Sequence, residues 1–308
     1  DEIEIGVLAE FIVYINMLTW PVAAVGWVTS VVQEAEASQK RINKFLNQKV
    51  EIKNGIGVKK SFNGEIIFEN VTLIYPETNT KALDNLSFKI KAGEKVGIVG
   101  KVGSGKSSLL NLINRLYDVD EGKVLIGGSN IKDFKLDKLR SLIGNVMQNP
   151  FLFSESIKDN LLFGKIDATK EEIEKACKNA AIHKTINSFK NGYDTILGER
   201  GLTLSGGQIQ RVSIARALIK NPQFFLFDDC LSAVDLDTEN KILKNIKVIC
   251  ENKTTIMVSN RISSIKDSDK IFVLENGKII ETGNHKTLME NKNYYSHLFN
   301  RQQNEKKY

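Results

Sequence analysis

A glycine-rich stretch followed by Lys106 and Ser107 has the residue types and the spacing that suit phosphate binding. Residues 100 to 107, GKVGSGKS, fit the pattern G-x-x-x-x-G-K-S. Glycines allow a tight loop whose backbone N–H groups face an anion at the start of a helix. A lysine at this spacing reaches the β- and γ-phosphates of a nucleotide, and the serine hydroxyl binds Mg²⁺. The pattern therefore predicts a site for ATP and Mg²⁺.

The residues around this loop predict the elements that hold it. Apolar residues 96–99 predict a strand that leads into the loop, and residues 108–117, SLLNLINRLY, have helical spacing. Short alternating strands are predicted earlier, in 64–75 and 82–90. A strand, a glycine loop and a helix in this order favour phosphate binding over an ordinary glycine turn. The loop residues expected at the nucleotide are Gly100, Gly103, Ser104, Gly105, Lys106, Ser107 and Ser108.

A second candidate for chemistry is the acidic pair Asp228 and Asp229, which follows the apolar run FFLF. In a nucleotide-hydrolysing enzyme, the first acid would organise Mg²⁺ and the second would act as a general base. The pair raises the question of whether Asp229 is a working base, or whether this chain binds ATP without hydrolysing it efficiently.

The N-terminal region has a different character. No charged side chain occurs from Phe11 to Val32, and as a helix this stretch would rise about 33 Å, enough to cross a hydrocarbon core of about 30 Å. The lysines and the arginine that follow favour a cytoplasmic face on that side. The acidic residues before it, and the lack of a small-residue cleavage site after it, argue against a signal peptide. The alternative is a buried helix of a soluble domain.

The overall composition narrows the function classes. The chain has 308 residues, of which 42% are hydrophobic and 26% charged, with a formal charge of +6. The lysines are scattered rather than clustered with aromatics, which argues against a nucleic-acid partner. Three cysteines without metal-ligand spacing (Cys177, Cys230 and Cys250) favour a reducing cytosol over a zinc or disulfide role.

Two further segments carry a family resemblance. Residues 202–218, LTLSGGQIQRVSIARAL, and the strand FFLFDD at 224–229 resemble the signature motif and the Walker B strand of ATP-binding cassette (ABC) ATPases. The resemblance covers residues from about 64 to 300. It implies an α/β fold of the P-loop NTPase type, with a RecA-like core, an antiparallel β-subdomain and a helical subdomain between Gln148 and the signature, preceded by a long transmembrane helix.

The resemblance also implies roles for single residues. Tyr75 looks like the aromatic that stacks on adenine, Gln148 like the Q-loop glutamine near Mg²⁺ and the attacking water, and Asp228 like the Walker B metal acid. The signature would bind ATP held by a partner subunit, because such sites form between two subunits arranged head to tail. The remaining nucleotide contacts that the resemblance implies are the signature residues Ser205, Gly206, Gly207 and Gln208 and the D-loop residue Asp235.

GERG at 198–201 resembles the X-loop of ABC exporters, and PFLFSESIKDNLLFG is also of exporter type. We therefore expect the chain to hold the last of six membrane helices and to be a fragment or an incompletely represented gene product, in the inner membrane with its nucleotide-binding domain on the cytoplasmic side. The expected divisions are the end of the transmembrane domain at 1–50 (helix about 5–33, extension to about 47), a linker at 51–63, the nucleotide-binding domain at 64–300 and a tail at 301–308.

The sequence departs from the family pattern at two places. Asp229 stands where the family has a glutamate, and a displacement of about 1 Å in a base costs on the order of a hundredfold in rate. Asn260, in TTIMVSNR, stands where active cassettes have the switch histidine. Asparagine can donate a hydrogen bond to a γ-phosphate but cannot hold a positive charge. We therefore list Asp229, Gln148 and Asn260 as the catalytic candidates of a weakened site.

Both departures weaken the nucleotide face of this chain, while its signature is intact. This asymmetry favours a heterodimer with a second ABC half-transporter that carries the glutamate and the histidine. The alternatives are a homodimer that hydrolyses ATP slowly with Asp229 as base, a non-hydrolytic ATP-binding subunit, and a soluble ABC ATPase outside transport. The uncharged N-terminal stretch and the X-loop resemblance argue against the last. The transported substrate is not indicated.

Overall fold

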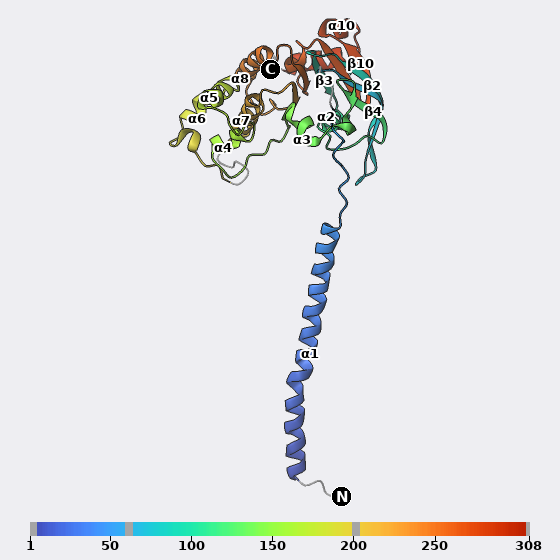
Figure 1. Cartoon of the computed structure of the whole chain (residues 1–308), viewed down its shortest axis with the longest axis vertical. Coiled ribbons are helices and arrows are strands. Elements are labelled where there is room, and N and C mark those ends of the chain that lie inside the picture. The colour runs from blue at the N-terminus through green and yellow to red at the C-terminus, as the bar shows by residue number, and fades with distance from the viewer. Residues whose placement is uncertain (1–4, 59–63, 199–203, 306–308) are drawn as a thin grey trace. The chain divides into compact units, whose positions relative to one another are not determined.

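A computed structural model describes residues 5–58, 64–198 and 204–305, and the chain divides into two compact units, Asp1–Lys53 and Asn54–Tyr308. The first unit contains a single helix, α1 (Ile5–Leu46), none of whose side chains is buried (Figure 1). By length and composition α1 is long and apolar enough to cross a membrane. Its polar side chains bond to the helix itself: Asn16 Nδ2 donates to the Ile12 carbonyl and Thr19 Oγ1 to the Ile15 carbonyl, both at 3.0 Å. Such internal satisfaction is what a hydrocarbon environment requires.

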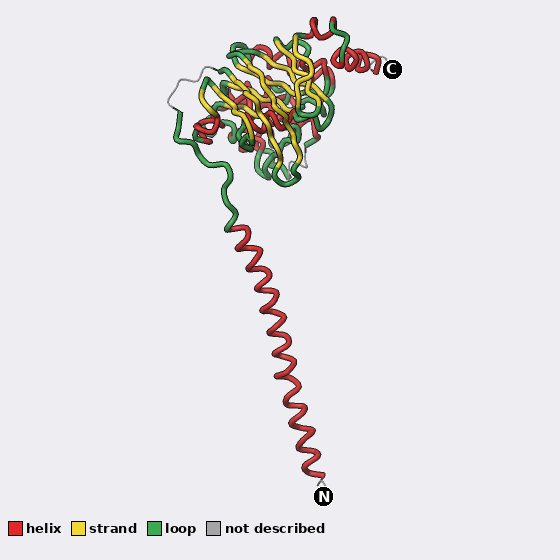
Figure 2. Tube along the Cα trace, turned by 90° about the vertical axis from the view of Figure 1, so that its right-hand side faces the viewer, coloured by secondary structure: helices red, strands yellow, loops and turns green. Residues whose placement is uncertain are grey.

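The second unit is built on two β-sheets with helices around them (Figure 2). One sheet is antiparallel, in the order β2-β1-β4-β5, and the other has the order β10-β9-β3-β8-β7-β6 and is parallel except for β10. The strands of the first sheet are β1 (Ile66–Tyr75), β2 (Thr80–Ile90), β4 (Glu121–Ile126) and β5 (Ser129–Asn130). Those of the second are β3 (Lys95–Gly100), β6 (Ile143–Val146), β7 (Phe224–Asp228), β8 (Thr254–Val258), β9 (Lys270–Glu275) and β10 (Lys278–Gly283).

The helices of this unit fall into two groups in Figure 1, with α4 to α8 on one side and α2, α3 and α10 nearer the strands. Their bounds are α2 (Lys106–Ile113), α3 (Leu136–Ser141), α4 (Ile157–Leu162), α5 (Lys170–Asn179), α6 (His183–Asn187), α7 (Gly206–Ile219), α8 (Leu236–Ile249), α9 (Ile262–Ile265), α10 (His285–Glu290) and α11 (Tyr294–Glu305), with short 3₁₀ helices at Ile131–Asp133 and Gly192–Asp194. The predicted α/β fold, with its antiparallel subdomain and its helical insert before α7, is confirmed.

Burial of β7 on both faces explains why its sequence is apolar without alternation. Phe224 and Leu226 lie in the core between the two sheets, whereas Phe225 and Phe227 lie in the core on the opposite face, and all four are fully buried. A parallel strand covered on both faces needs apolar residues at consecutive positions. Each such burial contributes about 1.5–3 kcal/mol relative to an exposed side chain. The FFLF run is therefore explained by packing and places the aspartates at the strand end.

The register of the parallel strands brings four strand ends to one edge. Ile98 of β3 pairs with Val258 of β8, Val258 pairs with Asp228 of β7, and Phe227 pairs with Val146 of β6. The residues that follow these strands therefore start from one edge of the sheet, which is where α/β proteins bind ligands.

One predicted element is shorter than expected. Helix α2 ends at Ile113, whereas the helical spacing extends to residue 117. Arg115 has a left-handed backbone (φ 49°), which a continuing helix does not allow. The buried guanidinium of Arg115 donates to Asp118 at 3.0 Å and to the carbonyl oxygen of Phe134 at 3.3 Å. The helix therefore ends before Arg115, whose side chain is held by a local acid and by the backbone of Phe134.

The apolar surface of α1 leads to a first prediction. Val22→Lys combined with Val25→Lys should move the chain out of the carbonate-resistant membrane fraction, because each lysine at a helix centre costs about 2.5–3.5 kcal/mol of insertion free energy. The matched control, Ala35→Lys with Ala37→Lys in the polar part of α1, should stay in that fraction. Carbonate-resistant sedimentation of the Val22/Val25 variant would contradict a membrane-spanning α1.

Candidate nucleotide-binding site

The loop between β3 and α2 has a conformation that only glycine fits. Gly103 and Gly105 have left-handed backbones, with φ of 81° and 97°. A Cβ atom on Gly100 would lie 2.1 Å from the carbonyl oxygen of Leu274, and one on Gly105 would lie 2.4 Å from that of Ala82. Both distances are far below contact, so these two glycines are required by the close approach of neighbouring backbone.

Lys106 closes this loop from within. Its Nζ donates to the carbonyl oxygens of Gly100 and Lys101, each at 2.8 Å, and only 9% of the residue is exposed. Burial lowers the pKa of Lys106, while the nearby carboxylates of Asp229 and Asp228 act in the opposite direction. Two of the three ammonium N–H groups thus bond to the loop, and the third can donate to a phosphate oxygen.

Ser104 supplies an independent sign that the loop fits an anion. Its hydroxyl oxygen is buried and, within the described part of the chain, has no hydrogen-bond partner. A buried polar atom without a partner costs about 1–3 kcal/mol, so an orphaned hydroxyl in a glycine loop fits a site that a ligand completes. The residues present therefore suit a phosphate group.

Ser107 and Asp228 lie together beside the glycine loop. Burial raises the pKa of Asp228, a hydrogen bond from Ser107 lowers it, and the neighbouring Asp229 raises it again. A carboxylate paired with a serine hydroxyl is an all-oxygen donor set of the kind that Mg²⁺ prefers. These two residues would hold the metal, as the sequence predicts.

Asp229 does not continue the strand. β7 ends at Asp228, and Asp229 takes a left-handed backbone (φ 42°) with its N–H on the Val258 carbonyl at 2.8 Å, so the strand predicted for 224–229 is one residue too long. Its carboxylate accepts from Asn260 Nδ2 at 3.0 Å and, at 3.4 Å, from Ser259 Oγ and the Asn260 N–H. The two departures from the family pattern are thus in direct contact.

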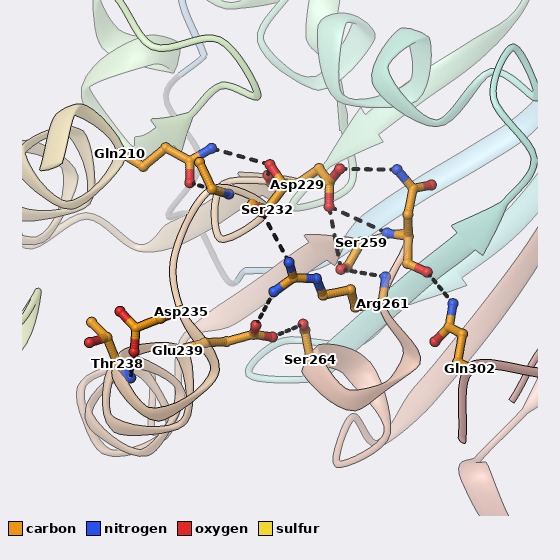
Figure 3. Close-up of polar contacts among 12 residues, drawn as sticks. Gln210, Asp229, Ser232, Asp235, Thr238, Glu239, Ser259, Arg261, Ser264 and Gln302 are labelled. Carbon is orange, nitrogen blue, oxygen red and sulfur yellow. Dashed lines mark hydrogen bonds and ion pairs between the residues drawn. The ribbon is translucent and has the colours of Figure 1, made fainter. Parts of the chain in front are cut away.

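Asp229 also connects to α7, the helix that begins within the signature (Figure 3). Ser232 Oγ donates to the backbone carbonyl of Asp229 at 3.0 Å and accepts from Gln210 Nε2 at 3.2 Å. Gln210, in α7, also accepts from the N–H of Ala233 at 3.1 Å. A hydrogen-bonded path therefore joins α7 to the acidic pair.

The sequence profile of the ABC transporter family matches residues 83–232, which contain the glycine loop, the signature and the acidic pair. The chain belongs to the ABC transporter family. A probable multidrug resistance ABC transporter ATP-binding/permease protein, YheI of Bacillus subtilis, is 39% identical over 306 residues, which are 98% of this chain and 52% of the relative. The multidrug resistance-like ATP-binding protein MdlA of Buchnera aphidicola is 41% identical over 303 residues, again 98% and 52%.

A solved structure agrees with these relatives. A bacterial Atm1-family ABC exporter with ATP bound superposes with a TM-score of 0.82 at 35% identity, over 94% of this chain and 51% of that one. The chain thus spans about half the length of the relatives it matches. The second unit is an ABC-type nucleotide-binding domain, and α1 is the long apolar helix that precedes it.

Within this ABC domain, Tyr75 lies beside α2, the helix that follows the glycine loop. Its hydroxyl donates to Ser108 Oγ in α2 at 2.9 Å, and its ring meets Tyr117 edge to face with centroids 5.0 Å apart. The adenine-stacking role of Tyr75 stays a prediction. Gln148 is exposed two residues beyond β6, and among the described residues its side chain makes no hydrogen bond. It starts from the same sheet edge as Asp228, as a Q-loop glutamine would.

The ABC signature lies on a different part of the domain. Ser205 caps α7, accepting from the Gln208 N–H at 3.4 Å, while its own N–H donates to Gln208 Oε1 at 2.9 Å. Helix α7 packs on α4, α5 and β6, whereas α2 packs on β2, β3 and β7. The structure therefore does not bring the signature to the glycine loop of its own chain.

The glycines of the signature face the segment after the acidic pair. A Cβ atom on Gly206 would lie 3.7 Å from Ala233 Cβ, in ordinary contact, but one on Gly207 would lie 2.7 Å from the Ala233 carbonyl oxygen. Most of the predicted X-loop, residues 199–201, and the first two residues of the signature stretch, 202 and 203, lie outside the described residues.

Asp235 acts as the N-cap of α8. Its carboxylate accepts from the Thr238 N–H at 2.9 Å, and this bond to the backbone lowers the pKa of Asp235. The residue is exposed. A capping role is what the sequence D-L-D-T would give any helix start, and the nucleotide contact implied for Asp235 stays a prediction.

Three residues near Asn260 escaped the sequence analysis (Figure 3). Arg261 donates to the buried Glu239 carboxylate at 2.6 Å and to the Ser232 carbonyl at 3.1 Å. Gln302, in the segment predicted as a tail, bonds to the backbone on both sides of Arg261. The pattern H-R in active cassettes is a signal for Arg261, but the contacts of Glu239 and Gln302 join residues more than 20 positions apart and have no local signal.

The glycine loop yields a second prediction. Gly105→Ala should lower the free energy of unfolding by about 3 kcal/mol, since it adds the left-handed penalty to a clash with a backbone carbonyl that cannot move aside. Gly103→Ala is the matched control: its Cβ would meet nothing within 4 Å, so only the backbone penalty of about 1–2 kcal/mol remains. Scanning calorimetry of both variants measures the difference. Equal destabilisation would show that the approach of Ala82 does not constrain Gly105.

Proposed function

We propose that the chain is the ATP-binding part of an ABC exporter of the multidrug type, located in the inner membrane with its nucleotide-binding domain in the cytoplasm. Mg²⁺ and ATP bound at the glycine loop would draw two nucleotide-binding domains together and so switch the membrane domain between inward and outward access. The observation that carries this proposal is the cluster of Lys106, Ser107 and Asp228 at one sheet edge, next to the orphaned hydroxyl of Ser104. The relatives named as ATP-binding/permease proteins support it.

The site should divide its tasks among these residues. Lys106 and the loop N–H groups would hold the phosphates, Ser107, Asp228 and Gln148 would hold the metal, and Tyr75 would contact the base. Bound Mg²⁺ would supply charge neutralisation at the β- and γ-phosphates. Asp229 would be the acid that acts on the attacking water.

The contacts of Asp229 support the proposal that hydrolysis at this site is weak. Both of its carboxylate oxygens accept hydrogen bonds, from Asn260 and Ser259. Oxygens already occupied by these donors are not free to accept from an attacking water, and the side chain is one methylene short of glutamate. Asn260 can donate to a γ-phosphate but cannot supply the positive charge that an imidazolium would.

The partner is proposed to be a second ABC half-transporter. The signature helix of this chain is well formed, with Ser205 and Gln208 in a reciprocal cap, but it is packed away from its own glycine loop. It would complete a site on a partner subunit with a glutamate and a histidine. A homodimer with two slow sites is the alternative, and a non-hydrolytic ATP-binding subunit is favoured by the same Asp229–Asn260 contact.

A third prediction tests nucleotide binding. Lys106→Ala should raise the Kd for Mg-ATP about 10- to 100-fold, because a hydrogen bond to a charged group contributes about 1.5–3 kcal/mol. The matched control is Lys220→Ala. Lys220 also donates to two carbonyls, of Arg140 and Ile143, at 2.6 and 2.7 Å, but at the opposite edge of the sheet. Calorimetric titration of the chain in detergent micelles should find Mg-ATP affinity unchanged in the control; an equal loss in both variants would refute a specific role for Lys106.

A fourth prediction tests the weakened site. The natural chain should turn over ATP close to background, and Asp229→Glu with Asn260→His should raise steady-state turnover on the order of a hundredfold. Each single variant should gain much less, because one missing group limits the other. Adding Lys106→Ala to the repaired chain is the control, and it should abolish the gain. Brisk hydrolysis by the natural chain would mean that Asp229 is an adequate base, and the argument for a degenerate half would fall.

A further inference from the structure

One side chain of the C-terminal helix α11, Gln302, hydrogen-bonds to the switch segment, Ser259 to Ile262. Gln302 Nε2 donates to the Asn260 carbonyl at 2.7 Å, and Gln302 Oε1 accepts from the Ile262 N–H at 2.9 Å. Both ends of one amide group are therefore used on the backbone that carries Asn260. A two-point contact fixes the orientation of a peptide segment better than a single bond does.

The first residues of α11 are also bonded to and packed against other parts of the domain. Tyr295 is fully buried in the core that holds Phe225 and Phe227, its hydroxyl lies 2.8 Å from His285 Nδ1, and its N–H donates to Glu281 at 3.1 Å. Lys101 of the glycine loop lies over the Tyr294 ring, 5.6 Å from its centroid. Helix α11 thus contacts the glycine loop near its start and the switch segment near its end.

The switch segment also has hydrogen bonds that do not involve α11. The Arg261 N–H donates to Ser259 Oγ at 3.0 Å, and its guanidinium donates to Glu239, which also accepts from Ser264 at 2.6 Å. These bonds fix the residues around Asn260, but the Asn260 carbonyl itself bonds to Gln302. The side chain of Asn260 is exposed, apart from its contact with Asp229. The direction of this side chain therefore depends on Asp229, which accepts from the Asn260 amide and backbone N–H, and on Gln302, which holds the Asn260 carbonyl.

We propose that Gln302 is a positioning residue for the nucleotide site: by clamping the backbone at Asn260 and Ile262, it sets the Asn260 amide where it can contact the γ-phosphate. This inference rests on the proposed function, since it assigns the γ-phosphate to Asn260. It adds a role for the end of α11, which the sequence predicts only as a tail. The consequence is that Gln302 governs discrimination between ATP and ADP without touching nucleotide.

The test compares Gln302→Ala with Gln303→Ala in the whole chain in detergent micelles. Gln303 is the next residue of the same helix, has the same side chain and is exposed, so it controls for helix propensity. Titrations with Mg-AMPPNP and Mg-ADP should give Gln302→Ala a Kd for Mg-AMPPNP about five- to tenfold higher, with the Kd for Mg-ADP within about twofold of the natural chain. Gln303→Ala should change neither value.

A merely structural role would predict something else. If Gln302 only helps α11 to pack, its loss should weaken both nucleotides together or neither, and either result overturns the proposal. In an Asn260→Ala background, Gln302→Ala should have no further effect on Mg-AMPPNP, because the two residues act in series. Additive losses in that background would also overturn it.

Hydrogen exchange without nucleotide separates this inference from the proposed function. The Ile262 amide should be protected in the natural chain and in Gln302→Glu, which keeps the acceptor, and should exchange faster in Gln302→Ala. Gln302→Glu should nevertheless lose Mg-AMPPNP affinity as Gln302→Ala does, because a carboxylate cannot donate to the Asn260 carbonyl. If the natural chain binds neither nucleotide, the proposed function fails and this inference with it. If Mg-AMPPNP binds the natural chain and Gln302→Ala equally, only this inference fails.

Discussion

The parallel register of β3, β8, β7 and β6 is the constraint on which the site depends. Because these strands point the same way and are paired without a shift, the P-loop, the acidic pair, the switch segment and Gln148 all begin at one edge. The strands stay in register because residues on both faces are buried in two distinct cores. A slip by one residue would move each side chain from one core to the other. Apolar packing therefore sets the positions of the polar side chains at this edge, although those side chains take no part in the packing.

Asp229 shows how a small backbone change determines the chemistry at that edge. Its left-handed conformation turns the chain out of β7, and its carboxylate then meets Ser259 and Asn260 of the neighbouring strand end. The two departures from the family pattern are therefore one hydrogen-bonded unit. A longer side chain at 229 or a histidine at 260 would change the atoms that meet in this contact. Changes at two positions in contact are not additive.

Sequence patterns predict the parts of this site that are local. The glycine spacing predicts a tight loop between a strand and a helix, which the structure has between β3 and α2, and the apolar FFLF run predicts the strand β7 that leads into the acidic pair. The parts that were missed depend on distant contacts. Arg115, just beyond the end of α2, bonds to Phe134, Asp229 bonds to a residue 31 positions away, and Gln302 bonds to one 42 positions away. Residue spacing carries no information about such pairs, because they form only once the sheet has set the neighbours.

The same contacts join the chain's own site to the surface that holds its signature. From Gln302 the bonds pass through Asn260 to Asp229, then through Ser232 to Gln210 in α7. Contact alone does not transmit a signal; an element with two arrangements is required. In this structure the Asn260 amide has one arrangement, with its N–H group on the Asp229 carboxylate. The path is therefore a set of contacts that holds the acidic pair, the switch segment and α7 in fixed positions relative to one another.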